Sequence, residues 1–160
     1  MKVNILLSAC FILGALLASA TTITLSDPIS PQGNIEPTEE WQEYTTIDDV
    51  RIEFKRQRCI PENDREQNLI LFRYTNLSND VKTLSWVTKI WRNDFCVNCN
   101  SITNPEYSHT ITLQPNQIIE ADGSSKTDKS IYIFDNFTKL VPGMQEQRLT
   151  NFELIDLNVK

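Results

Sequence analysis

The sequence predicts an all-β protein, an antiparallel sandwich of the immunoglobulin-like or fibronectin-like kind with about seven strands. Three observations lead to this fold class. Apolar and polar residues alternate with a period of two in several short segments after residue 49. Turn-forming residues separate these segments. No segment carries a convincing helical repeat, so short strands joined by polar loops are the favoured interpretation.

The first two predicted strands differ in how many faces they bury. In residues 50–55, Val50, Ile52 and Phe54 alternate with charged residues, which predicts one apolar face and one solvated face. Residues 69–75, LILFRYT, are apolar on both faces. That pattern is typical of a central strand that is covered on both sides.

The third predicted strand, within residues 82–91, carries two tryptophans on opposite faces. Leu84, Trp86 and Ile90 share one face, and Trp86 is the candidate for the buried tryptophan of a sandwich core. Trp91 lies on the other face. There it either packs in a second layer or is exposed on a binding surface.

Four further strands complete the predicted sandwich: residues 107–113, 118–121, 131–134 and 152–159. In the last of them the alternation slips after Leu154 and resumes at Leu157, which predicts a β-bulge. Together the strands place the β-sandwich domain at residues 49–160.

Residues 21–48 have the composition of an extended leader or linker. They contain three prolines and scattered acidic and apolar residues without sustained periodicity. Trp41 and Tyr44 are the side chains of this stretch that can dock on the domain. Docking would end the unstructured part of the leader before residue 40.

Residues 1–20 have the features of a secretory signal peptide. An apolar run without charge follows Lys2, and the small residues Ala18, Ser19 and Ala20 suit a signal peptidase. We therefore expect an exported protein, periplasmic or extracellular, with no transmembrane segment in the mature chain. Two alternatives are less favoured: a lipoprotein attached through Cys10, and an uncleaved membrane anchor.

The charge of the chain makes nucleic acid an unfavourable partner. The formal net charge is −6, and without Lys2 the remaining chain carries 14 basic against 21 acidic residues, a net −7. Such a chain repels phosphate backbones. The basic cluster at residues 55–58 is not interleaved with aromatic residues, so we expect it at the solvated end of a strand.

The stretch FCVNC places Cys96 and Cys99 in a loop between two predicted strands. No helix follows that would stabilise a thiolate, and Asp94 adds a negative charge, so a redox couple is disfavoured. A zinc site would need a set such as Cys96, Cys99, Cys59 and His109, which the spacing does not require. We predict a structural disulfide and no metal or cofactor. Three pairings remain open, and Cys96 with Cys99 closes the shortest loop.

The region around this loop resembles a group of small exported single-domain bacterial proteins. The shared features are a W-x4-W strand, a C-x2-C loop, an EY-x2-T strand and a closing LTxFEL strand, and they span about two thirds of the chain. The resemblance implies the sandwich fold and export, and it implies no activity. The group carries a further Cys that can partner the equivalent of Cys59. This chain has none at residues 120–125, which leaves Cys59 as the odd free thiol.

Other motifs are weak, and no enzyme is predicted. The chain has no Gly-rich phosphate loop and no G-x-S-x-G, and its single histidine, His109, is expected to be partly buried and hydrogen-bonded. A calcium loop at Glu120, Asp122 and Asp128 lacks the spacing of a known motif. Asn76 and Asn136 lie in glycosylation sequons, and in a bacterium they are turn and strand-end residues.

The function that these observations favour is that of an exported, non-enzymatic binding module. Its partner would be an unidentified protein or glycan, or an envelope or surface assembly, bound through loops at one end of the sandwich. Trp91 and Phe95 are the candidate binding surface. The alternative is a thiol-active or metal-handling periplasmic protein that uses the C-x2-C loop.

Overall fold

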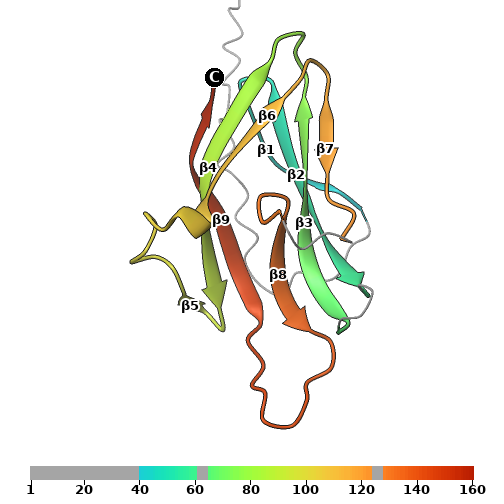
Figure 1. The fold of residues 1–160 in the computed structure, drawn as a ribbon, viewed down its shortest axis with the longest axis vertical. Coiled ribbons are helices and arrows are strands. Elements are labelled where there is room, and N and C mark those ends of the chain that lie inside the picture. The colour runs from blue at the N-terminus through green and yellow to red at the C-terminus, as the bar shows by residue number, and fades with distance from the viewer. Residues whose placement is uncertain (1–39, 61–64, 124–127) are drawn as a thin grey trace, which may run out of the picture.

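The computed structural model describes residues 40–60, 65–123 and 128–160. Within them nine β-strands form two antiparallel sheets that pack face to face, without closing into a barrel (Figure 1). The predicted all-β antiparallel sandwich is confirmed. The two strands beyond the predicted seven are an N-terminal edge strand and a two-residue strand next to the cysteines.

The first sheet has β3 (Gln67–Asn76) at its centre. On one side β3 pairs with β2 (Val50–Cys59), which in turn pairs with the edge strand β1 (Gln42–Ile47). On its other side it pairs with β7 (Ile118–Glu120) and with β8 (Tyr132–Phe137). Pairing on both sides and packing on both faces explain why the run at residues 69–72 of β3 is apolar on both faces.

The second sheet has β4 (Lys82–Arg92) at its centre. β9 (Leu149–Val159) lies along one side of it, and β6 (Ser108–Leu113) and the short β5 (Phe95–Cys96) lie along the other. A single 3₁₀ turn, η1 (Pro105–Tyr107), leads into β6.

The predicted bulge in β9 is confirmed. Asn158 pairs with Ser85 and Ile155 with Val87, so two residues of β9 face one residue of β4 between those pairs. Asp156, in the bulge, has a φ of 54°. This backbone conformation absorbs the extra residue and restores the inward direction of the apolar side chains.

Aromatic side chains from both sheets form the core. Trp86 is buried, as predicted, and its ring lies 5.2 Å from that of Tyr74 in the facing sheet. Phe152 of β9 packs edge-on against Phe54 and Phe72, at 5.4 and 5.5 Å. These ring contacts cross from one sheet to the other, and each buried ring stabilises the sandwich mainly by leaving water.

The structure differs from the sequence-based boundary at residues 42–47, which form β1 instead of belonging to the leader. Tyr44 is only 3% exposed and stacks on Phe152 at 5.9 Å. Trp41 lies between Lys55 and Arg73, each within 4.6 Å of its ring centre, so the predicted docking of both aromatic residues is confirmed. The predicted signal peptide at residues 1–20, with Cys10, and the rest of the leader lie outside the described residues.

The basic cluster at residues 55–58 does not lie wholly in solvent, so that prediction was wrong for Arg56. Its side chain continues the inward face of β2 after Phe54, and the residue is 4% exposed. Arg56 Nε donates to Asp135 Oδ2 at 2.8 Å, and Asp135 on β8 is fully buried. A charged residue is tolerated on this face because its counter-ion reaches the same place from a distant strand.

Each open side of the sandwich is bridged by a side chain. On one side the Tyr44 hydroxyl accepts a hydrogen bond from Leu154 N on β9, at 3.0 Å. On the other side the Arg92 guanidinium donates to the carbonyls of Phe134 and Asp135 on β8, at 2.7 Å each. The second bridge forms one end of a cleft.

In the described part of the chain no helix is long and apolar enough to cross a membrane.

Candidate functional site

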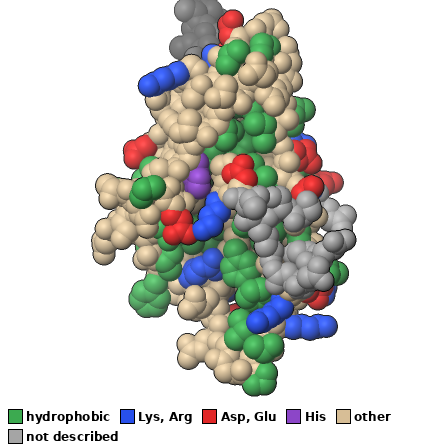
Figure 2. Space-filling view, viewed as in Figure 1, with side chains coloured by type: hydrophobic (Ala, Val, Ile, Leu, Met, Phe, Trp, Pro, Cys, Tyr) green, Lys and Arg blue, Asp and Glu red, His purple; other side chains and the backbone are tan. Residues whose placement is uncertain are grey.

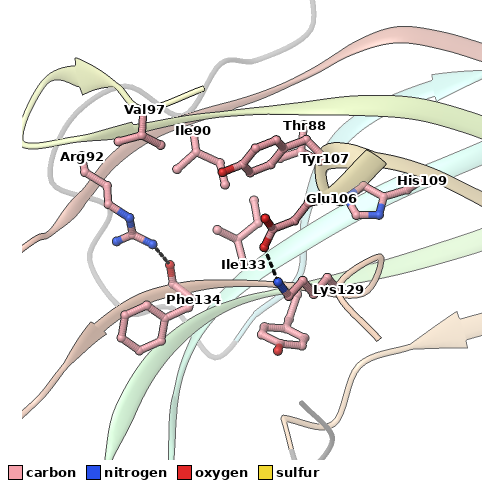
Figure 3. Close-up of a pocket in the computed structure, with 11 residues that line it drawn as sticks. Thr88, Ile90, Arg92, Val97, Glu106, Tyr107, His109, Lys129, Ile133 and Phe134 are labelled. Carbon is pink, nitrogen blue, oxygen red and sulfur yellow. Dashed lines mark hydrogen bonds and ion pairs between the residues drawn. The ribbon is translucent and has the colours of Figure 1, made fainter. Parts of the chain in front are cut away.

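The candidate site is a cleft of about 230 Å³ between the two sheets, on the side where β8 faces β4 and η1 (Figure 3). Its walls are apolar and aromatic: Ile90, Val97, Tyr107, Tyr132, Ile133 and Phe134. Its polar groups are Thr88, Arg92, Glu106, His109 and Lys129. Concave sites that combine apolar walls with a few polar groups are typical of ligand binding.

The wall on the second sheet depends on Asn98, which takes the place of a missing strand. β6 pairs with β4 only up to Val87, and β5 pairs with it only from Trp91 onward. Between them the Asn98 amide donates to Thr88 O at 2.7 Å and accepts from Ile90 N at 2.9 Å. The buried Asn98 side chain therefore satisfies backbone groups that would otherwise be unpaired.

The cysteine loop is closed as predicted. Cys96 and Cys99 lie at disulfide distance, with their Cα atoms 5.6 Å apart. Their short loop contains Asn98 and Val97, and Val97 lines the cleft, so the staple holds part of the cleft wall. The backbone N of Val97 also donates to Ile90 O, at 2.9 Å. Covalent and hydrogen-bonded restraints together hold this wall in place.

The two residues predicted as a binding surface lie at the end of the second sheet, outside the cleft lining. Phe95 is 78% exposed, whereas Trp91 is half-buried and pairs with Cys96 across the β4–β5 ladder. Their role as a binding surface stays a prediction. The sequence pattern carried no sign of the cleft on the inner face of the same strand.

Arg92 closes one end of the cleft. Its guanidinium donates to three backbone carbonyls: those of Phe134, Asp135 and Gln147, the last at 3.0 Å. Figure 3 shows the side chain reaching across to Phe134. Burial lowers the pKa of Arg92, and the nearby Asp135 carboxylate opposes that shift. Arg92 therefore acts mainly as a strut between the sheets.

An ion pair between Glu106 and Lys129 closes the other end. Glu106 follows Asn104, whose side-chain oxygen accepts from Glu106 N at 3.0 Å and caps η1. Lys129 lies in a turn that Asp128 stabilises by accepting from Ser130 N at 2.9 Å. Both side chains are about half exposed, and their pairing raises the pKa of Lys129. The pair joins one sheet to the other across the mouth of the cleft (Figure 3).

His109 lies beside this ion pair and is half-buried, as predicted. Its ring packs on Trp86, with the ring centres 5.3 Å apart. Burial is the main cause that lowers its pKa, so the ring is neutral at pH 7. The predicted hydrogen bond is not found with any described residue. Figure 2 shows the single histidine of the chain beside acidic and basic side chains on this face, with apolar side chains next to them.

Cys59 lies far from the other cysteines, on the outer face of the first sheet. It is a free, buried thiol that packs with Leu69, Leu71 and Ala121, and burial raises its pKa. A methyl group added at Gly123 would clash with its sulfur. In the described part of the chain no three His, Cys, Asp or Glu side chains gather as metal ligands.

The two sequon asparagines have structural partners. Asn76 is buried, its side-chain nitrogen donates to Asp80 O at 2.7 Å, and its oxygen accepts from Ser78 N at 2.9 Å. Asn136 accepts a hydrogen bond from Asn68 at 3.0 Å. Asn76 therefore serves the turn after β3, as the interpretation for a bacterial chain predicts, and its buried amide is inaccessible to a glycosylating enzyme in the folded protein.

No protein-family model matches the sequence, and no curated protein and no solved structure matches it either. The resemblance to exported bacterial proteins stays a prediction, as does export itself. The cleft and the loop next to it are therefore the features of this chain that bear on its function.

Sequence reasoning had no signal for most of the cleft. The pair Asn104-Pro105 marks a turn and so places Glu106 and Tyr107 at a strand entry. It does not identify Lys129, which is 23 residues further along the chain. Only the pairing of β4 with β6, and the packing of the two sheets, brings these side chains to one opening.

Proposed function

We propose that the protein is an exported, non-enzymatic binding module that takes a ligand group into the cleft between its sheets. The observation that supports this proposal is the cleft itself, which has aromatic and apolar walls and charged groups at both ends. The lining side chains come from β4, β6, β8 and a stapled loop. Rigid elements hold a binding site with little loss of conformational entropy when the ligand enters.

The polar groups of the cleft support binding better than catalysis. Glu106 is engaged with Lys129, and the Thr88 hydroxyl accepts a hydrogen bond from the indole of Trp86 at 3.2 Å. The Asp128 carboxylate acts on the His109 ring electrostatically, but its Oδ1 accepts hydrogen bonds from Ser130, and no hydrogen bond to a described carboxylate orients the ring as a base. A nucleophile with an oriented base is the arrangement that covalent hydrolytic chemistry requires.

The cysteines support a structural role over the thiol-active alternative. Cys96 and Cys99 lie at disulfide distance, and burial raises the pKa of the Cys59 thiol, which keeps it protonated and unreactive. A disulfide also suits the oxidising compartment that the signal-peptide features of residues 1–20 indicate. The exposed Phe95 extends the proposed binding surface from the mouth of the cleft to the end of the sheet.

The proposal is tested by mapping small probes on the exported protein with amide NMR. The probes are neutral monosaccharides, free amino acids and a tripeptide, each titrated to millimolar concentration. We expect at least one class to shift the amide signals of Ile90, His109 and Ile133. The variant Val97→Trp, which fills the cleft mouth, should abolish these shifts.

Ile102→Trp is the matched control, because Ile102 is an exposed apolar residue of the same connection and does not line the cleft. It should leave the shifts unchanged. If no probe class shifts the cleft signals, or if Val97→Trp binds as well as the parent protein, the cleft is not the binding site.

A further inference from the structure

The cleft is poorly suited to anionic ligands. Its half-buried cation, Arg92, gives three of its five N–H donors to backbone carbonyls, so only two remain for a carboxylate or phosphate. Its other cation, Lys129, is already paired with Glu106. The acidic chain as a whole further repels anions.

An extended peptide has little to pair with along the strands of the cleft. Strand addition requires a row of free backbone groups at a sheet edge. Here Arg92 occupies the carbonyls of Phe134 and Asp135 on β8, and Asn98 occupies Thr88 O and Ile90 N on β4. The protein therefore covers both edges that face the cleft with its own side chains.

A wholly apolar ligand is disfavoured by the groups at the mouth. Glu106 Oε2, the Tyr107 hydroxyl and the His109 ring have no hydrogen-bond partners among the described residues. A ligand that covered them without pairing would remove their water at a cost. The ligand must instead offer donors and acceptors on one side and an apolar surface on the other.

We propose that the ligand of this cleft is a neutral sugar unit, with adjacent hydroxyls held by Glu106 and Lys129 and its C–H face against the tyrosine rings. The volume of about 230 Å³ is below the range of about 300–1,000 Å³ that is usual for drug-sized ligands, which suits a single ring. This inference rests on the proposed function and names the ligand class for the same site.

The ion pair at the mouth supplies the contacts that this ligand needs. Glu106 uses one oxygen for Lys129 and keeps the other as an acceptor, while Lys129 keeps donors beyond the one it gives to Glu106. A carboxylate and an ammonium side by side match two neighbouring hydroxyls, one donating and one accepting. Both side chains are half exposed, so they adjust to a ligand at little cost. Tyr107 and Tyr132 line the same cleft.

The test titrates the exported protein separately with D-glucose, D-galactose, D-mannose and N-acetyl-D-glucosamine, and with D-glucuronate, phenol, phenylalanine and a tripeptide for comparison. We expect at least one neutral sugar to bind with a dissociation constant of about 1 mM, corresponding to a few hydrogen bonds on a small ligand. It should shift the amide signals of Ile90, His109 and Ile133. D-glucuronate should bind more weakly than its neutral counterpart.

Three variants test the contacts. Glu106→Gln and Lys129→Gln each replace a charged contact with a neutral amide, and Tyr107→Leu removes an aromatic ring from the cleft wall; each should weaken sugar binding about fivefold. Arg58→Gln is the matched control, because the Arg58 side chain is also exposed and its ion pair with Glu66 lies outside the cleft. It should leave binding unchanged. Amide spectra of all four variants check that the fold is kept.

The outcomes separate this inference from the proposed function. If phenol, phenylalanine or the tripeptide shifts the cleft signals and no neutral sugar does, the ligand class is wrong while the binding cleft stands. If no probe shifts them, both fall. Sugar binding that Arg58→Gln weakens as much as Glu106→Gln, or that maps to amides elsewhere, also overturns the inference.

Discussion

Removing the carboxylate of Asp135 should be among the most destabilising single changes in the domain. Asp135 is 0% exposed, and its Oδ2 accepts from Arg56 Nε at 2.8 Å and from Nη2. Its Oδ1 accepts from Leu149 N at 2.9 Å, which ties β8 of one sheet to β9 of the other. One side chain thus neutralises a buried cation and links the two layers.

The expected loss for Asp135→Ala is about 3–5 kcal/mol, because a buried guanidinium would lose the carboxylate of its buried ion pair. A domain of this size has a stability of about 5–15 kcal/mol, so the loss would consume much of the total. Asp135→Asn should lose nearly as much. It keeps an acceptor for Leu149 N but removes the negative charge that faces the Arg56 guanidinium.

The assay is urea unfolding followed by tryptophan fluorescence, which reports the buried Trp86. The double variant Arg56→Met with Asp135→Leu removes both charges and fills their space with apolar atoms. It should be more stable than either single Asp135 variant. Losses of under about 1 kcal/mol for both Asp135→Ala and Asp135→Asn, or a double variant as unstable as the single ones, would refute the reasoning.

Three further predictions concern the staple, a glycine and an ion pair. Replacing Cys96 and Cys99 with Ser should lower the free energy of unfolding by about 2 kcal/mol, from the closure of a four-residue loop. The amide spectrum should stay native because Asn98 still anchors the loop, and an unchanged midpoint in urea would argue against the staple. Gly123→Ala should destabilise the fold more than Gly143→Ala. Both glycines have positive φ, but only a methyl group at Gly123 would meet the Cys59 sulfur. Equal losses of unfolding free energy in the two variants, measured by calorimetry, would contradict the clash. Hydrogen bonding from Arg73 lowers the pKa of Glu53 in the folded protein below its ordinary value of 4.5. The contribution of this ion pair to folding stability is therefore fully present above pH 4.5, and it is lost as the pH falls through the lowered pKa of the folded state. Glu53→Gln should flatten this acid-side decline in stability curves, and a parallel decline in the variant would count against it.

The strands were predictable where one strand carried its own complete pattern. The alternation of Val50, Ile52 and Phe54, the two-sided apolar run of β3 and the slipped register after Leu154 each reflect a local period that burial imposes. The staple was predictable for a similar reason. Cys96 and Cys99 lie close along the chain, so their pairing needs no knowledge of the fold.

The edge strand β1 escaped prediction because its pattern is weak. In Gln42–Ile47 only Tyr44 is buried, and an edge strand needs no second apolar side chain when a single ring reaches the core. The prediction that residues 55–58 lie at the solvated end of a strand was wrong for Arg56, although the local pattern there is strong. Arg56 carries a charge that normally indicates exposure, and its burial depends on Asp135, which lies 79 residues away.

The sequence by itself determined the all-β class, most strand positions and the bulge, and it favoured the pairing of the nearby cysteines, because each depends on residues close along the chain. Tertiary structure alone decided the inward place of Arg56, the role of Asn98 as a substitute strand, and the cleft between Arg92 and the Glu106–Lys129 pair. These features depend on which strands lie side by side and on how the two sheets face each other. A periodicity of two describes one strand's faces, and it carries no information about what each face meets.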